Sequence, residues 1–173
     1  FCVLPLMLAG CGMAEYDIQP SPVRRTSKNV YAWGADGIWT PGITFVTPGD
    51  LAVTPTLALG LYSRSGAIVD VWFTYLVAAG LFTHTTASGE LRITNLPFTA
   101  RDEANANQQM VGTLQFEGIT KASYTHYAVV SAENTNYMVV TASGSGQTWA
   151  SVNAADMPTG GNPRLMGWLR YFT

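Results

Sequence analysis

The stretch from Gly60 to Phe98, GLYSRSGAIVDVWFTYLVAAGLFTHTTASGELRITNLPF, decides the fold. A short turn around Gly66 leads into an apolar run, Ala67 to Val77, and a small-residue turn then precedes Glu90 to Leu96. Val, Ile, Trp, Phe and Tyr are concentrated between turns marked by glycine, which is typical of neighbouring β-strands. An amphipathic helix over residues 68–77 is the alternative, and the β-branched and aromatic content argues against it.

The two strands of this stretch differ in pattern. Residues 68–77 are too continuously apolar for strict alternation, which indicates a central strand covered by the opposed sheet on one side and by a partner subunit on the other. Asp70 lies within this run. We expect it to form an ion pair with Arg64 or Arg92. The later strand alternates, with Leu91 and Ile93 facing the core and Leu96 on the opposite face with Arg92.

The remainder of the chain supplies further strands separated by turns. Glu133–Asn136 is predicted to be a hairpin turn and residues 143–147, SGSGQ, a flexible loop. With eight or nine strands and no credible helix, the sequence predicts an all-β, antiparallel, jelly-roll-like β-sandwich over residues 38–173. The expected additional strands are Ile38–Phe45, Leu51–Leu61, Val111–Ile119, Tyr124–Ala132, Tyr137–Ala142, Trp149–Val152 and Arg164–Thr173.

Two segments precede this domain. Residues 1–12, FCVLPLMLAGCG, form an apolar segment whose Leu8-Ala9-Gly10-Cys11 resembles the lipobox of bacterial lipoproteins, with Cys11 as the lipidated residue of a truncated signal. The alternative is that Met13 is the true start. Residues 13–37 carry prolines and little periodic pattern, so they are interpreted as an extended linker or arm, with a disordered tail as the alternative.

Composition narrows the class of protein. Only 12% of residues are charged and 47% are hydrophobic, which favours a β protein that buries additional area in an oligomer, and a neutral monomeric sandwich is the alternative. A formal charge of -2 argues against a nucleic-acid partner, because neutralising phosphates requires clustered Lys and Arg. No stretch approaches the roughly 18–20 apolar residues of a membrane span. We therefore expect membrane contact only through a lipidated Cys11.

No catalytic or metal-binding pattern is present. The two histidines, His84 and His126, lack partners at ligand spacing, so we expect neither a metal nor another cofactor. His84 is predicted to be solvated and His126 to be structural or interfacial. The carboxylates are scattered singly, whereas glycoside hydrolysis requires a pair that converges across a cleft. The sequence predicts a protein that is not an enzyme, and a polysaccharide-degrading enzyme is the competing class.

Aromatic residues near polar turns are the candidates for binding. Exposed Trp or Tyr rings stack on sugars while polar neighbours hydrogen-bond the hydroxyl groups. Burial in the core or in a subunit interface is the alternative for each. The candidate binding residues are Tyr127, Asn134, Asn136, Tyr137, Gln147 and Trp149.

Three motifs occur in order: a Trp39-Thr40-Pro41 strand, the turn Gly60–Gly66, and the strand Ile93-Thr94-Asn95-Leu96-Pro97-Phe98. Together they resemble the carboxy-terminal domains of bacteriophage tail-fibre and related virion fibre proteins. The motif residues look structural, with Gly66 permitting the turn and Phe98 filling the core, so no binding residue is carried over.

This resemblance implies a homotrimeric, non-enzymatic structural or adhesion protein of the virion. It would contact other virion proteins through the N-terminal arm and bind a glycan or protein on the host surface. The alternative is a bacterial surface lipoprotein, held at the outer membrane through Cys11, that uses the same β-sandwich for binding or assembly.

Overall fold

The computed structural model describes residues 34–102 and 109–173. The predicted apolar segment 1–12, with Cys11, and all but the last residues of the predicted arm 13–37 lie outside this range. One compact unit spans Tyr31–Thr173. Its first strand begins at Gly34, so residues 34–37 belong to the sheet and not to the arm.

The described chain consists of ten strands and one short 3-10 helix. In chain order they are β1 (Gly34–Trp39), β2 (Gly42–Thr47), β3 (Ala52–Ser65), β4 (Ile68–Thr83), β5 (Ser88–Thr94), β6 (Val111–Glu117), β7 (His126–Ser131), β8 (Met138–Gly144), β9 (Gln147–Ser151), η1 (Ala154–Asp156) and β10 (Arg164–Phe172).

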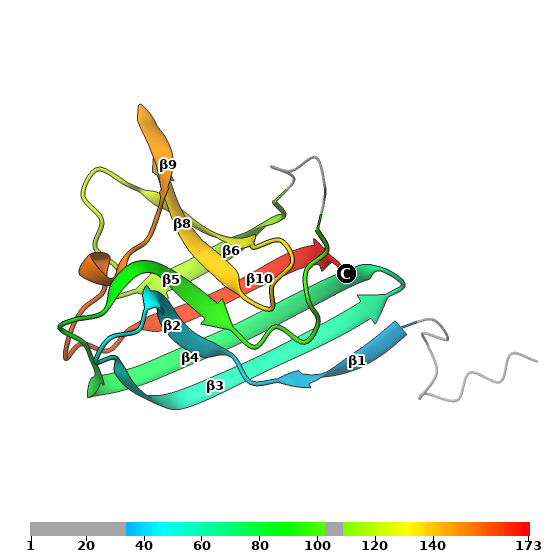
Figure 1. Cartoon of the computed structure of the whole chain (residues 1–173), viewed down its shortest axis with the longest axis horizontal. Helices are drawn as coiled ribbons and strands as arrows, with labels where there is room; N and C mark the ends of the chain where they lie inside the picture. The colour runs from blue at the N-terminus through cyan, green and yellow to red at the C-terminus, as the bar shows by residue number, and fades with distance from the viewer. Residues whose placement is uncertain (1–33, 103–108) are drawn as a thin grey trace, which may run out of the picture. The chain divides into compact units, whose positions relative to one another are not determined.

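All ten strands belong to one antiparallel sheet in the order β1-β3-β4-β10-β6-β7-β8-β5-β2, and β9 pairs with the later part of β8, on the same edge as β5. The sheet curls so that β2, β5 and β8 lie over β3, β4 and β10, as Figure 1 shows. The all-β, antiparallel, sandwich-like fold predicted from the sequence is therefore confirmed.

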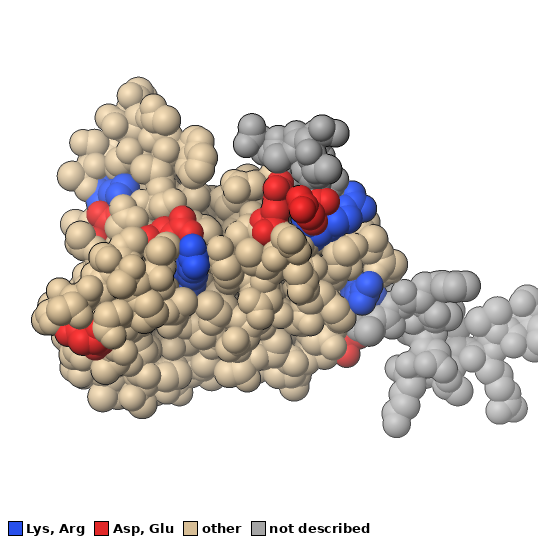
Figure 2. Space-filling view, in the orientation of Figure 1, with Lys and Arg blue, Asp and Glu red and all other residues tan. Residues whose placement is uncertain are grey.

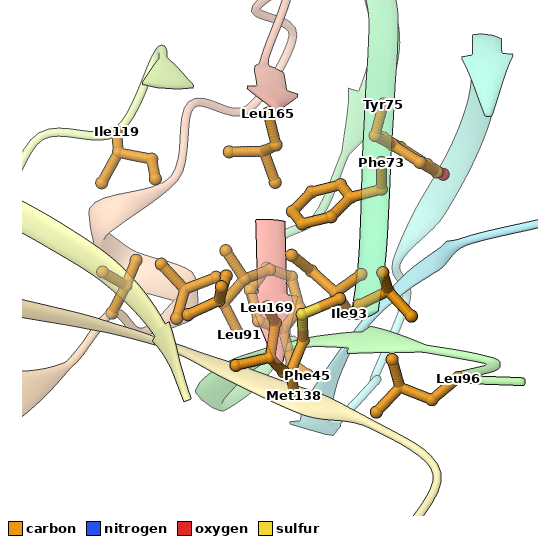
Figure 3. Packing of buried hydrophobic residues seen from close by; sticks show 14 of the residues in the cluster. Phe45, Phe73, Tyr75, Leu91, Ile93, Leu96, Ile119, Met138, Leu165 and Leu169 are labelled. Carbon is orange, nitrogen blue, oxygen red and sulfur yellow. The ribbon is translucent and has the colours of Figure 1, made fainter. Parts of the chain in front are cut away.

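The core lies between the two layers and is built by alternation along the strands. On β4, every second residue from Val69 to Val77 is buried, and these side chains meet Leu91 and Ile93 of β5 and Met138 of β8. Figure 3 shows the side chains of these layers converging. The expected inward positions of Leu91 and Ile93 are confirmed, because neither side chain is exposed.

The predicted central strand over residues 68–77 is confirmed, and its cover by a partner subunit stays a prediction. These residues form a central strand between β3 and β10, but they alternate strictly between buried and more exposed positions. The outward residues are themselves apolar, as Trp72 illustrates with 44% exposure. Continuous apolarity therefore reflects two different apolar faces, and only the inward one is covered within this chain.

The strand β4 continues beyond Val77, where the predicted apolar run ends, through Ala78-Ala79-Gly80 to Thr83. The loop before β10 supplies hydrogen bonds along this extension: the Gly80 N–H donates to the Gly160 carbonyl at 2.9 Å, and the Gly160 N–H donates to the Phe82 carbonyl at 2.7 Å. The strand thus reaches Phe82, which is fully buried.

Leu96 does not lie on the face predicted for it. The strand β5 ends at Thr94, and Asn95 adopts a left-handed conformation with φ 65°. This residue breaks the alternation, and the Leu96 N–H donates to the Asn136 carbonyl at 2.8 Å. Leu96 is consequently buried with 5% exposure.

The ion pair predicted for Asp70 involves a different arginine. Asp70 lies directly opposite Arg170 in the β4–β10 pairing, and its carboxylate accepts hydrogen bonds of 2.9 Å from Arg170. Arg92 instead pairs with Glu90 at 2.9 Å. No local pattern in the sequence places the last strand beside β4, so the sequence alone does not identify Arg170 as the partner.

Two smaller predictions are also wrong. His84 is not solvated: its ring centroid lies 5.4 Å from that of Phe45 and 5.5 Å from that of Phe82, and its Nε2 is buried. The segment 143–147 is not a loop, because Ser143 and Gly144 end β8 and Gln147 begins β9. Only the two residues between these strands form the turn.

Candidate binding groove

A groove of about 610 Å³ crosses the outer face of β6, β7, β8 and β9. Its volume lies within the roughly 300–1,000 Å³ of typical small-molecule sites. A smaller hollow of about 60 Å³ adjoins it and shares several lining residues, among them Trp149 and Thr141. The residues that line the groove are Gln109, Val111, Ala128, Val130, Thr141, Ser143 and Trp149.

Strand alternation determines which side chains reach this groove. On β8, Val140 and Ala142 point into the core, so Thr141 and Ser143 between them face outward. On β7, the same rule turns Val129 inward and Ala128 outward. The side chains at the centre of the groove are therefore small, which leaves room above the strands.

Two exposed apolar side chains flank this centre. Val111 on β6 is 65% exposed and Trp149 on β9 is 62% exposed. The strand order places them on opposite sides of β7 and β8. The indole is held at the edge of the sheet by the β8–β9 hairpin, in which Ala142 pairs with Ala150.

The groove is amphipathic. The Trp149 ring offers an apolar face with an N–H donor, and the hydroxyl groups of Thr141 and Ser143 can each donate and accept a hydrogen bond. Sugar rings present the matching combination of apolar C–H faces and hydroxyl groups. Figure 2 shows that charged side chains are sparse on this view and gather in small groups. The arrangement suits an uncharged, hydroxylated ligand.

One charged pair stands at the end of the smaller hollow. Glu90 lines the hollow, and its carboxylate accepts two hydrogen bonds from Arg92 at 2.9 and 3.1 Å. Ser151 contacts the other carboxylate oxygen at 3.4 Å. The Arg92 guanidinium also lies 4.3 Å from the centre of the Tyr137 ring. The negative charge of Glu90 is thus balanced by the guanidinium of Arg92, and the hydrogen bonds fix its side chain in place.

The structure brings only part of the predicted binding set together. Trp149 lines the groove, and Gln147 is exposed on the same strand. Tyr137 lies beside Arg92, near the smaller hollow. Asn134 and Asn136 are exposed in the turn before β8. The seven residues of β8 separate this turn from the β8–β9 turn by about 20 Å.

Tyr127 lies elsewhere. Its ring packs against that of Phe116 with centroids 4.2 Å apart, and it is half-buried against the core. The side chain therefore points away from the outer face on which the groove lies.

Sequence reasoning missed most of the groove. Val111, Ala128, Thr141 and Ser143 are ordinary strand residues without a motif. Alternation marks each of them as outward-facing, but their meeting depends on β6, β7, β8 and β9 being neighbours in that order. The pairing of strands carries this information, and the residue types do not.

Neither a metal site nor a membrane helix is found in the part of the chain that the structure describes. Within residues 34–102 and 109–173, no three His, Cys, Asp or Glu side chains gather where they could hold an ion. Among the same residues, no helix has the length and apolarity needed to cross a bilayer.

Comparison with known proteins gives one informative likeness. No protein-family model matches the chain, and no curated protein matches its sequence. Among solved structures, the Dettilon tailspike protein is similar, with a TM-score of 0.57 and 14% sequence identity. The likeness covers 81% of this chain and 24% of the tailspike chain. At this identity it shows a shared fold, and the present chain spans about a quarter of the tailspike's length.

Proposed function

We propose that this chain is a bacteriophage virion protein of the tail-fibre or tailspike type, a structural and adhesion component that binds the host surface. The tail-fibre motifs, Trp39-Thr40-Pro41 and the segments around Gly66 and Phe98, support this proposal. The fold shared with a tailspike protein supports it as well. In this proposal the protein acts in the virion, outside the cell.

The groove around Trp149 is the proposed adhesion site, and this is the observation that carries the proposal. The Trp149 indole is 62% exposed beside small hydroxylated residues, so it offers an apolar face on which a sugar ring can stack. The host ligand is a surface glycan or protein, and the groove chemistry favours the glycan.

The adhesion is proposed to be non-enzymatic. Among the described residues that line the groove and the adjoining hollow, Glu90 is the single carboxylate, and Arg92 holds it at 2.9 Å. Hydrolysis of a glycosidic bond requires two carboxyl groups, about 5–9.5 Å apart, flanking the bond. A glycan bound beside Trp149 would therefore be held and not cleaved.

The proposed assembly is a homotrimer whose N-terminal arm contacts other virion proteins. The low charge content, 12%, supports an assembly that buries further surface. The arm lies outside the described residues, so its contacts rest on the sequence alone.

Binding of the full chain to an array of bacterial capsular, O-antigen and teichoic-acid glycans tests the adhesion site. We expect binding to at least one glycan, and we expect Trp149→Ala to weaken it about tenfold, equivalent to about 1.4 kcal/mol. Thr148→Ala is the matched control, because Thr148 is exposed on the same strand and alternation places it on the other face.

Two results would contradict the proposal. Equal affinity of the Trp149→Ala and Thr148→Ala variants would remove the groove as the site. Absence of binding to every glycan and to host envelope proteins would remove the adhesion role. Shortening of a bound polysaccharide during incubation, followed by size-exclusion chromatography, would overturn the non-enzymatic assignment.

A further inference from the structure

A second apolar surface lies on the opposite layer of the sheet, away from the groove. Among the described residues, nine large hydrophobic side chains are exposed, and six of them lie on β1, β3 and β4; all of these except Leu81 belong to this surface. We call this surface the Trp72 face. It consists of Ile38, Leu57, Leu59, Leu61, Trp72 and Met166.

Strand register aligns these residues into rows. Ile38 lies opposite Leu61, Leu61 lies opposite Trp72, and Trp72 lies opposite Trp168, so one apolar row crosses β1, β3, β4 and β10. In the next row, Leu59 and Met166 flank Thr74. Neighbouring side chains in such rows reinforce one another across the strands.

The face is not explained by the core of this chain. Residues that alternate with it, such as Val71 and Phe73, already fill the interior with 0% and 4% exposure. An antiparallel sheet with one solvated face normally places polar residues outward. Here Leu61 is 49% exposed and Trp72 is 44% exposed. The strands are built to be covered on both sides.

The exposed area is large for a monomer. With about 200 Å² for each fully exposed large side chain, the exposed fractions of the face's members on β1, β3 and β4 amount to roughly 500 Å². The largest apolar patch on a typical monomer covers about 300–600 Å², and one side of a standard interface buries about 800 Å². With its half-buried border, the face approaches one side of such an interface.

The charges around the face indicate which partner covers it. No charged residue stands among the six that form it, so a strongly charged partner gains nothing there. At one end Asp70 and Arg170 form an ion pair of 2.9 Å, and at the other end Arg164 lies opposite Glu117. Each end of the face therefore carries one positive and one negative side chain. A second copy of the face, packed parallel or antiparallel to the first, can place opposite charges against one another.

The surface also has a hollow that can receive a side chain. An open depression of about 260 Å³ lies between Leu59, Leu61, Trp72 and Met166. The Cβ-free Gly167 contributes to its lining. A Leu or Trp side chain from a second copy of the same surface would suit this hollow in size and in apolar character.

We propose that the Trp72 face is the surface through which copies of this chain pack against one another, each turning this face toward a shared axis. The proposal deepens the oligomer of the proposed function and rests on it. The groove around Trp149, on the other layer of the sheet, then stays free to bind a ligand in every copy.

Light scattering of the full chain coupled to size-exclusion chromatography tests the proposal at micromolar concentrations. We expect a homo-oligomer for the unaltered protein and the mass of a single chain for Leu61→Arg, with the far-UV circular dichroism preserved because residue 61 is half exposed. Val46→Arg is the matched control: Val46 is 48% exposed on β2, outside the face, and this variant should keep the oligomer.

Oxidative footprinting of the unaltered protein gives a second readout, which does not depend on whether a variant folds. Trp72 and Met166 should be protected, whereas Trp149 should be oxidised rapidly. A single-chain mass for the unaltered protein, an oligomer that persists in Leu61→Arg, or equal oxidation of Trp72 and Trp149 would each overturn the proposal.

The two proposals fail in different ways. An oligomer that persists in Leu61→Arg while Trp149→Ala loses glycan binding would remove this interface and leave the adhesion role intact. Dissociation by Leu61→Arg without binding to any glycan would remove the adhesion role and leave the interface intact.

Discussion

The guanidinium carbon of Arg64 lies 4.5 Å from the centre of the Phe98 ring. The ring of Tyr62 meets Phe98 edge-on, with centroids 5.4 Å apart. These contacts join the turn motif that ends at Gly66 to the strand motif that ends at Phe98. Arg64 is held in place from its other side, because its Nε donates to the Gly66 carbonyl at 2.9 Å. The two motifs are therefore parts of one structural cluster, whose residues support the sheet.

A double-mutant cycle measures this cluster. We expect Phe98→Ala to lower the free energy of unfolding by about 2–3 kcal/mol, because the ring is half-buried and its loss opens a cavity. Arg64→Ala should cost about 1 kcal/mol, and the coupling between the two changes should be about 0.5–1 kcal/mol. Urea unfolding at fixed protein concentration provides the values. A coupling of zero would show that Arg64 and Phe98 are neighbours without mutual stabilisation.

Gly60 gives a second prediction about packing. A Cβ atom at this position would lie 2.2 Å from Nε1 of Trp39, whose indole rests against the strand and donates to the Leu61 carbonyl at 3.3 Å. Trp39 is buried with 6% exposure and has little freedom to move. Gly60→Ala should therefore destabilise the protein by about 1–3 kcal/mol. Thr56→Ala, at an exposed position of the same strand, should stay within about 0.5 kcal/mol in the same thermal unfolding experiment.

The sequence predicted the local elements well and their neighbours poorly. Val69 to Val77 could be assigned to a strand from β-branched and aromatic content, and Leu91 and Ile93 could be assigned to the core from alternation. The partner of Asp70 could not, because Arg170 is one hundred residues away and meets it only through the β4–β10 pairing. Strand order is set by the whole core, which no local pattern reports.

The candidate groove shows the same division. Trp149 was predicted because an aromatic residue beside a polar turn is a local signal. Thr141 and Ser143 were not predicted, because their role depends on the small Ala128 beside them on the next strand. The end of β4 was also not predicted, because the Gly80 N–H bonds to the carbonyl of Gly160, which is distant in the sequence.

Two buried tyrosines predict loss of stability in alkaline solution. Burial raises the pKa of Tyr75 and of Tyr171 to about 12, against about 10 for an unfolded chain. The neutral form is thus favoured by folding, so this stability is fully present below pH 10 and is lost as the pH rises from about 10 to 12. Tyr75 is only 3% exposed, and it contributes about 3 kcal/mol at most to the free energy of unfolding that is lost over this pH range.

Ultraviolet titration checks the alkaline prediction. Tyr75 and Tyr171 should ionise near pH 12, or together with unfolding. Tyr75→Phe should remove one of them and flatten the fall of the melting temperature between pH 10 and 12. If the melting temperature of Tyr75→Phe falls as steeply as that of the unaltered protein, the assignment to Tyr75 is wrong.

Asp50 predicts the opposite dependence in acid. Its carboxylate accepts hydrogen bonds from the Thr85 hydroxyl group, from the Thr85 N–H at 2.9 Å and from the Thr86 N–H at 2.7 Å. These donors, with the Thr85 hydroxyl first, hold the pKa of Asp50 well below its usual range. The bonds join the β2–β3 turn to the turn before β5.

The sign of this dependence follows from the depressed pKa. The contribution of Asp50 to stability is present above about pH 4, where the unfolded carboxyl is ionised, and it is lost as the pH falls toward the lower pKa of the folded state. Asp50→Asn should lower the melting temperature at pH 7 and should make it less sensitive to pH between about 4 and 2 than in the unaltered protein. The measurement is a thermal melt at each pH. Parallel curves for the two proteins would mean that the hydrogen bonds to Asp50 do not distinguish its ionised form.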